Sequence, residues 1–473
     1  MGTGGKRSHL LVAAGSNSGG QLGLGHTDDV HRFTPSLCLQ SSHQQSFPPP
    51  GSQILSLSSG ANHTAVIVGS SHDRTEFWFA GHRSEGQCGE LDTSGANSGA
   101  TTMVFFTLIE IQAICKQANL TGNGWAPKSV ACGWASTFLV LEDEKGERDD
   151  AILALGRSNA FGELGIGQVP TSASRLDQIC HQIDLSMDRS QTDGRLVIHS
   201  IAAGLRHALV HYSIGKTKHF ICGWGAARHG ELSPRCIYTS MGSGTGEDVA
   251  EIHVENVFAK VQWHPMTILQ WEAQDGISSV QLACGKQHSV ILLLRRNQAN
   301  QTITRALWVA GAPQLIEQVQ DRTRHLDPKL IGCCWNGITL ANSDTNQLWS
   351  AGSNRHGQIA NGEWTATGEG LVRFPEGIAI QSFACGSEHL VACSASEAKE
   401  REASSGSTSS KQSESHQRKT AWAWGWNEHG TLGCGDDLDR AQPTMVEQMD
   451  TYEVQDVFAG CGTSFLQLVD VSM

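Results

Sequence analysis

Two short motifs alternate along the whole 473-residue chain, and each occurs seven times. The first, which we call the turn motif, reads in its fullest form Gly-x-Asn followed by Gly-Gln-Leu-Gly, and it ends a short apolar run. Clear copies begin at Gly15, Gly156, Gly225, Gly352 and Gly425, and degraded copies at Gly81 and Gly311. Repetition on this scale is typical of folds whose units bury their faces only against their neighbours.

The second motif, which we call the hairpin motif, is a small residue, often Cys-Gly, and then His three residues after the Gly. Clear copies end at His63, His207, His288 and His389; Ser136 takes the His place in another, and the copies at 333–337 and 460–464 are looser. Each lies between neighbouring turn motifs, except the last, which follows the turn motif at Gly425. The apolar runs that follow have the length and the Val, Ile, Leu and Trp content of strands.

Seven such units predict an all-β fold, a seven-bladed β-propeller. Glycines beside Asn allow the positive φ of a tight turn, and small residues allow neighbouring sheets to approach closely. The chain starts with an unpaired turn motif at Gly15 and ends with an unpaired hairpin motif at 459–468. We therefore predict that the N- and C-terminal strands pair in one blade and close the ring, which removes exposed sheet edges. One propeller domain should span 1–473.

Polar stretches interrupt the repeat. They lie around 40–52, 92–102, 177–194, 235–248 and 394–420. The last stretch is rich in Ser, Glu and Lys and has no apolar content. We predict that 394–420 is a disordered loop inserted within a blade.

Charge and cysteine content limit the function classes. The formal net charge is -13 with no basic run, which argues against direct nucleic-acid binding. No apolar window of membrane-spanning length exists, and 1–6 lacks the apolar core of a signal peptide, so we expect no membrane association. The 14 cysteines should then be reduced thiols of a protein in the cytoplasm and the nucleus.

No catalytic or metal signature stands out. The four motif histidines occupy one repeat position, so the ring should spread them apart, and we assign them a structural role. Four motif cysteines invite a zinc site, but the chain has no Cys-x-x-Cys pair, and packing is the better interpretation; they are Cys132, Cys284, Cys333 and Cys385. We expect no cofactor, no metal and no enzymatic activity. A hydrolase with its site in the central channel is the weakest alternative.

The two alternating motifs resemble those of the regulator-of-chromosome-condensation repeat family, whose members are seven-bladed propellers. Within that family, four segments are similar to the fungal alpha-tubulin suppressor type: 14–17, 21–29, 131–134 and 222–225. That resemblance implies an accessory protein. It would bind a small zinc- or iron-carrying partner that serves diphthamide synthesis on elongation factor two and Elongator-dependent modification of tRNA wobble uridines. The family's founding member, an exchange factor for the GTPase Ran, has a basic N-terminal tail; here that region offers only Lys6 and Arg7.

The variable centre of each turn motif should emerge on one face of the ring. The candidate partner-binding residues there are Arg157, Arg228, His229, Arg355, His356, Glu428 and His429, with Trp224 and Trp426 close by. Arg, His and Trp on one rim of an acidic protein suit an acidic protein partner. The alternative is that these are solvated turn residues and that the Trp side chains pack between blades.

These observations predict a non-catalytic interaction scaffold. The second hypothesis is a guanine nucleotide exchange factor for a small GTPase, in which one long insertion would act as a wedge at the nucleotide site.

Overall fold

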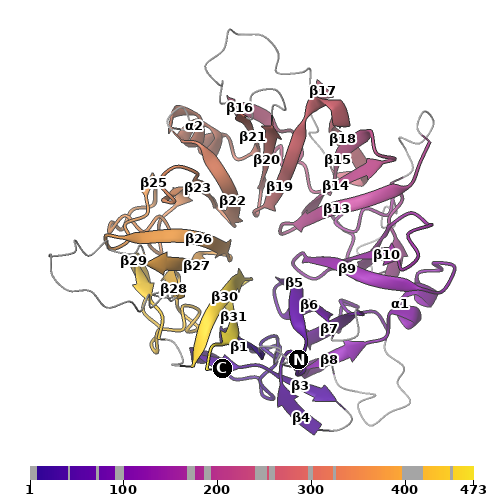
Figure 1. Cartoon of the computed structure of the whole chain (residues 1–473), viewed down its shortest axis with the longest axis horizontal. Coiled ribbons are helices and arrows are strands. Elements are labelled where there is room, and N and C mark those ends of the chain that lie inside the picture. Colours follow the sequence, from indigo (N-terminus) through magenta and orange to yellow (C-terminus); the bar gives the residue numbers. More distant parts are fainter. Residues whose placement is uncertain are drawn as a thin grey trace, which may run out of the picture.

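Seven mainly antiparallel sheets are arranged around a central axis in the computed structural model (Figure 1). The structure describes residues 8–40, 43–70, 74–90, 101–167, 176–185, 193–239, 253–254, 261–296, 302–322, 326–396, 419–447 and 451–472. We number the sheets as blades 1 to 7, starting from the blade that contains the first strand. The arrangement confirms the predicted seven-bladed β-propeller.

Blade 1 joins the two ends of the chain. Its strands, from the axis outward, are β30 (Tyr452–Ala459), β31 (Thr463–Asp470), β1 (His9–Gly15) and β2 (Val30–Pro35). β1 pairs with β31 along its whole length, from His9 opposite Val469 to Gly15 opposite Thr463. The predicted closure by the N- and C-terminal strands is therefore confirmed.

Blades 3, 6 and 7 follow the simple four-stranded plan. Blade 3 contains β9 (Trp125–Cys132), β10 (Thr137–Asp143), β11 (Ala151–Leu155) and β12 (Cys180–Gln182). Blade 6 contains β22 (Pro328–Cys334), β23 (Gly337–Asn342), β24 (Leu348–Ser353) and β25 (Thr367–Leu371). Blade 7 contains β26 (Ile378–Cys385), β27 (His389–Ser396), β28 (Lys419–Gly425) and β29 (Arg440–Met445).

Blade 2 has two extra strands, and the second of them lies within the first polar stretch, 40–52. Its main strands are β5 (Gln53–Ser59), β6 (His63–Gly69), β7 (Thr75–His82) and β8 (Thr102–Ile109). A hairpin of β3 (Leu37–Gln40) and β4 (His43–Ser46) continues the sheet beyond β8. The segment after β8 forms the short helix α1 (Ile111–Gln117).

One strand from the chain segment of blade 4 pairs in the sheet of blade 5, which the sequence did not predict. Blade 4 contains β13 (Leu196–Ala203), β14 (His207–Ile214), β15 (Lys218–Gly225), β18 (Gln262–Glu272) and the short β17 (His253–Val254). Blade 5 contains β19 (Ile277–Cys284), β20 (His288–Arg296) and β21 (Ile303–Gly311), and a 3-10 helix at Ala273–Asp275 precedes it. Its outer strand is β16 (Arg235–Thr239), which leaves the chain between β15 and β18 and pairs with β21.

The placement of β16 explains the degraded turn motif at Gly311. In blades 1, 2, 3, 6 and 7 the turn motif leads to the outer strand of the same blade, whereas after β21 the chain enters the helix α2 (Pro313–Arg322). The outer position of blade 5 is already filled by β16, so no strand is needed there. The polar stretch 235–248 is thus in part a strand, and 240–252 lie outside the described residues.

The two ends of the segment 394–420, for which we predicted a disordered loop, belong to strands. Ser394 belongs to β27 and Thr420 to β28, and their hydroxyl oxygens are 2.9 Å apart. Residues 397–418 lie outside the described residues. Over the part of the chain that the structure describes, no helix is long and apolar enough to cross a membrane.

The four motif histidines each bond to the next blade, which confirms the structural role predicted for them. Nε2 of His63 lies 3.1 Å from Thr137 Oγ1, and Nε2 of His207 lies 2.9 Å from Ser289 Oγ. The other two rings bond carbonyl oxygens of the following blade, at 3.2 Å each, from His288 to Gly337 and from His389 to Thr463. Burial lowers the pKa of His207 to about 3, so its ring stays neutral.

Glycine in the hairpin motif is required by the close approach of neighbouring blades. A Cβ on Gly204 would lie 2.3 Å from the carbonyl oxygen of Gly285, and one on Gly386 would lie 2.6 Å from that of Gly460. No side chain fits in that space. The hydrophobic core accordingly lies between blades, as where Phe138 of blade 3 meets Trp224 of blade 4 with ring centroids 5.4 Å apart.

Candidate functional site: the loop face and the central channel

Both motifs emerge at the same end of the blades. In blade 4, His207 pairs with Gly225 at one end of the β14–β15 hairpin, and Ile214 pairs with Lys218 at the other. The hairpin motif precedes His207 and the turn motif follows Gly225, so both lie at the first end. We call this end of the propeller the loop face. Loops displayed on a rigid scaffold are where binding residues most often lie.

Asn in the turn motif holds each loop in shape. Oδ1 of Asn427 accepts a hydrogen bond from Leu432 N at 2.8 Å, and its Nδ2 donates to the carbonyl oxygens of Asp436 and Leu438. Asn17, Asn159 and Asn354 accept the same bond from the residue five positions later. All four side chains are buried, and the loops are therefore defined by internal bonds.

Trp224 does not reach the surface of the loop face. Its side chain is 0% exposed, and its indole N–H donates to the carbonyl oxygen of Glu163 in the preceding blade at 3.1 Å. It packs between blades 3 and 4, so it cannot contact a partner.

Three of the predicted residues connect neighbouring blades. Nδ1 of His356 lies 2.8 Å from an Asp439 carboxylate oxygen, and Nδ1 of His429 lies 2.7 Å from one of Asp29. Trp426 is edge-on to both imidazole rings, with centroids 6.3 and 5.3 Å away. Each histidine thus bonds an aspartate of the next blade and is only partly exposed.

Arg157 is also engaged locally. Its guanidinium donates to the carbonyl oxygens of Leu176 and Asp177, both at 3.2 Å, and lies 3.5 Å from the Glu90 carboxylate. These bonds hold it against its own loop and blade 2.

The other predicted residues, Arg228, His229, Arg355 and Glu428, are exposed on the loop face. The structure adds two residues that the sequence analysis missed. The guanidinium of Arg206 lies 3.8 Å from the centre of the Phe161 ring, and that of Arg228 lies 6.0 Å from it. Arg206, Arg228 and His229 form what we call the basic sector, on blade 4. No motif pointed to Arg206, because it occupies a variable place in the hairpin motif.

An acidic region lies elsewhere on the same face, on blades 7 and 1. It consists of the exposed carboxylates of Asp28 and Asp437, with Leu438 62% exposed beside them. We call it the acidic sector. The loop face thus carries opposite charges at separate places, together with exposed large apolar side chains such as Leu438 and Trp364.

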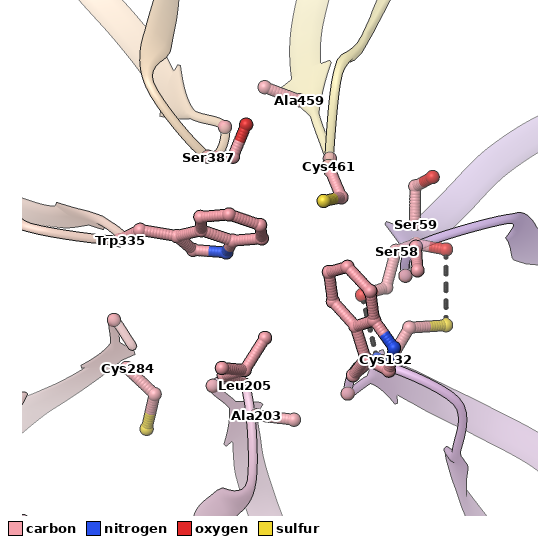
Figure 2. A pocket seen from close by; sticks show the side chains of 18 of the residues that line it. Ser58, Ser59, Cys132, Ala203, Leu205, Cys284, Trp335, Ser387, Ala459 and Cys461 are labelled. Carbon is pink, nitrogen blue, oxygen red and sulfur yellow. Dashed lines mark hydrogen bonds between the residues drawn. The ribbon is translucent and has the colours of Figure 1, made fainter. Parts of the chain in front are cut away.

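The central channel opens at the centre of this face. The hairpin motifs of all seven blades line a cavity of about 130 Å³ (Figure 2). Trp335 points into it from blade 6, and its ring centroid lies 5.7 Å from that of Trp134, which is 43% exposed. Lys286 Nζ lies 5.8 Å from the Trp335 ring. The mouth therefore offers aromatic surface beside a cation.

The channel wall is not built for hydrolysis. Burial raises the pKa of the Cys132 and Cys284 thiols to about 12, so neither is a thiolate near neutral pH. The described lining residues include no carboxylate and no histidine, so the cavity offers no general base. Cys132 Sγ instead donates to the Ser58 carbonyl oxygen at 3.3 Å, in keeping with a packing role.

Comparisons with known proteins agree with the repeat pattern. The family model of the Regulator of chromosome condensation (RCC1) repeat matches residues 420–467. The matched segment extends from β28 to β31, and all seven blades of the propeller carry the same two motifs.

Two solved structures share the fold. Prp20p of Saccharomyces cerevisiae superimposes with a TM-score of 0.59 at 16% identity, covering 98% of this chain and 92% of that one. Human WBSCR16 gives a TM-score of 0.58 at 14% identity, covering 99% and 100%.

Among relatives by sequence, the mouse (Mus musculus) secretion-regulating guanine nucleotide exchange factor is 27% identical over 480 residues, which is 96% of this chain and 82% of the relative. The cattle (Bos taurus) protein of the same name is 32% identical over 220 residues, 46% of this chain and 36% of the relative.

Proposed function

We propose that this protein is a guanine nucleotide exchange factor that docks a small GTPase on its loop face. The observation that carries the proposal is the similarity to the mouse exchange factor, which extends over 96% of this chain and 82% of that protein. The match therefore includes all seven blades and is not confined to one repeat.

Exchange requires a preformed surface and no covalent chemistry. A protein that binds the nucleotide-free GTPase more tightly than the loaded one weakens nucleotide binding by the same factor, because the two binding equilibria are linked. A closed ring suits this task, since loops held by internal bonds lose little conformational entropy on binding.

Charge on the loop face supports a defined docking orientation. The basic sector lies on blade 4 and the acidic sector on blades 7 and 1. A partner with complementary charges would be attracted in one orientation and repelled in the reverse one. The exposed rings at the channel mouth, with Leu438, would supply the apolar contacts that stabilise such interfaces.

The accessory role in diphthamide synthesis and Elongator function ranks second. It is favoured by the resemblance of segments 14–17 and 21–29 to the alpha-tubulin suppressor type. The relatives reported above carry no name connected with either process, so they do not support it. Its test is affinity purification of the tagged chain, which should recover a small zinc- or iron-binding protein if this role is correct.

The exchange activity is tested by release of fluorescent GDP from a panel of small GTPases. Catalytic amounts of the wild-type chain should accelerate release from at least one of them. The double variant Arg228→Glu with Arg355→Glu should lower that acceleration by about 10-fold or more, equivalent to about 1.4 kcal/mol of docking energy.

The matched control reverses two exposed charges at the opposite end of the blades, with Lys145→Glu and Lys216→Glu. Its exchange activity should equal that of the wild type. A wild-type chain that accelerates no GTPase in the panel would rule out the exchange function. Equal activity of the two double variants would place the docking surface away from the loop face.

A further inference from the structure

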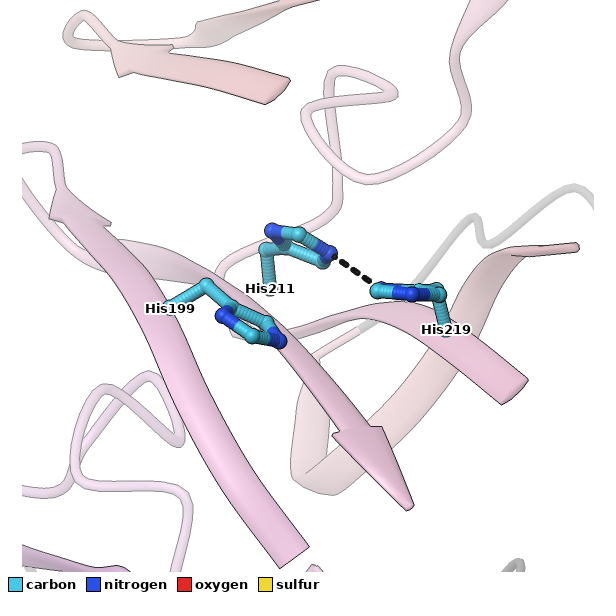
Figure 3. Close-up of side chains that lie close together, drawn as sticks. All are labelled: His199, His211 and His219. Carbon is cyan, nitrogen blue, oxygen red and sulfur yellow. Dashed lines mark hydrogen bonds between the residues drawn. The ribbon is translucent and has the colours of Figure 1, made fainter. Parts of the chain in front are cut away.

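Three histidines converge on blade 4, at the end of the strands opposite the loop face (Figure 3). His199 comes from β13, His211 from β14 and His219 from β15. One ring nitrogen of each lies within 4.8 Å of the others. We propose that this cluster binds a divalent first-row transition metal ion, with Zn²⁺ as the best match, through one nitrogen of each imidazole.

The repeat itself does not require a histidine at the position of His199. Each innermost strand has a β-bulge at the same place, where one residue has no partner on the next strand. The bulge residues of blades 2 to 7 and then 1 are Leu55, Lys128, His199, Ser278, Lys329, Gln381 and Gln455. Bulges redirect side chains and are common beside functional sites.

At the position of His211, too, histidine occurs in blade 4 alone among the seven blades. His211 pairs with Ser200, the residue after the bulge. Its equivalents in blades 2, 3, 5, 6, 7 and 1 are Ile67, Val140, Leu294, Ala341, Cys393 and Gln467. Propeller packing therefore accepts an aliphatic residue there, and burial of a polar ring calls for a separate explanation.

The distance between two of the rings suits a shared ion. His211 Nε2 and His219 Nδ1 are 3.2 Å apart. Two nitrogens at about 2.0–2.1 Å from a tetrahedral zinc ion lie roughly 3.3–3.4 Å from each other. The His199 ring is exposed, its centroid lies 4.7 Å from that of His211, and one of its nitrogens already lies within 4.8 Å of the other two ligand nitrogens.

The surroundings favour neutral, oriented imidazoles. Burial lowers the pKa of all three histidines, to about 3 for His211, and only a neutral imidazole binds a metal ion. Trp271 stacks on the rings of His211 and His219 with centroids 5.3 and 5.4 Å away. Ser213 Oγ lies 2.8 Å from His199 Nε2, as expected of a residue that orients a ligand.

Nearby charged groups come from two strands and from the connection between β10 and β11. Glu272 of β18 acts on His219, and its negative charge would favour a cation. Lys128 of β9 and Asp150, which form an ion pair at 2.9 Å, act on His199 in opposite directions.

Binding requires a change of tautomer and no net loss of protons. The hydrogen now shared between His211 and His219 would move to the outer nitrogen of the ring that carries it. His199 and His219 leave the cluster accessible from solvent, so a water molecule would complete four-coordination.

Titration of the full chain with Co²⁺, a spectroscopic substitute for Zn²⁺, tests the site. One equivalent should bind and give visible d–d bands without the near-ultraviolet band of a cobalt–thiolate bond. Zn²⁺ should displace it. His199→Ala and His219→Ala should each weaken Co²⁺ binding by at least about 10-fold, because losing a ligand lowers metal affinity no less than losing a residue that only orients a ligand.

His229→Ala is the matched control, since it removes an exposed imidazole on the loop face and should leave Co²⁺ binding unchanged. Far-ultraviolet circular dichroism of each variant establishes that it is folded. A thiolate band, absence of stoichiometric binding, or unchanged affinity in the two folded cluster variants would overturn the proposal. None of these outcomes depends on nucleotide exchange.

Discussion

At the level of single residues, buried histidines bond each blade to the next one, and buried asparagines hold the turn-motif loops in shape. The sequence indicated that His207 and its equivalents are structural, and each indeed bonds to the next blade. The partner-binding candidates were less predictable. Whether Trp224 faces solvent or the core depends on which side of its strand meets blade 3, and sequence alone did not decide that. The imidazole cluster was missed because its three members have no fixed spacing along the chain.

The buried motif histidines make stability depend on pH. Burial lowers the pKa of His63, His288 and His389 to about 4 and that of His207 to about 3, below the value of about 6.5 for an unfolded chain. The unfolded state therefore binds more protons between about pH 6.5 and pH 4. Stability is complete above that window and should fall as the pH falls through it, by up to about 1.4 kcal/mol per pH unit for each group.

Urea unfolding at several pH values measures this dependence. His207→Gln should be less stable than the wild type at pH 7.5. On acidification its free energy of unfolding should fall less steeply, because about one proton fewer is taken up on unfolding. His229→Gln, which changes an exposed ring, should keep the wild-type slope. An unchanged slope for His207→Gln would show that this ring is not held neutral by burial.

Loss of a turn-motif asparagine should destabilise the fold. Asn427→Ala leaves the buried Leu432 N–H and the partly buried Asp436 carbonyl oxygen without the partner that Asn427 supplies, whereas the Leu438 carbonyl oxygen keeps its bond from Arg440. An unsatisfied buried group costs about 1–3 kcal/mol. We expect a loss of roughly 2–4 kcal/mol, measured by urea unfolding at pH 7.5. Asn123→Ala, at an exposed position, should change stability by less than about 0.5 kcal/mol.

At the level of elements, inner strands were easier to predict than outer ones. Inner strands are apolar and begin next to a motif, whereas β16 is short and partly exposed. The weak motif at Gly311 was interpreted as a decayed repeat; the structure shows that the outer strand there comes from an earlier segment. Strand order depends on pairing between distant segments, which motif spacing does not record.

Glycine at the start of the turn motif should be irreplaceable because an added Cβ would collide with the neighbouring strand, and a matched variant separates this effect from that of the backbone conformation. Gly425 has φ +99°, and an added Cβ would lie 2.6 Å from the Glu388 carbonyl oxygen. Gly377 has φ +80° with no atom within 4 Å of such a Cβ. Gly377→Ala should cost about 1–2 kcal/mol from its backbone conformation alone, and Gly425→Ala distinctly more. Equal losses of unfolding free energy would remove the steric argument.

At the level of the whole molecule, closure of the ring followed from the unpaired motifs at the two ends of the chain. Deleting 463–473 removes β31, which lies between β1 and β30. Two strand edges would then be exposed, and we expect aggregation during size-exclusion chromatography. Deleting only 471–473, beyond β31, should leave a monodisperse protein. A monodisperse 463–473 deletion would mean that the ring does not need this strand.

The strand β16 lies in the chain segment of blade 4 but in the sheet of blade 5, and this arrangement restricts how such a chain can change over evolutionary time. In a propeller of independent repeats, gene duplication or deletion adds or removes one blade at a time. Here, losing the segment that encodes blade 4 would also take away the outer strand of its neighbour, and losing blade 5 would leave β16 without a sheet. The two blades can therefore be inherited, duplicated or lost only as a pair.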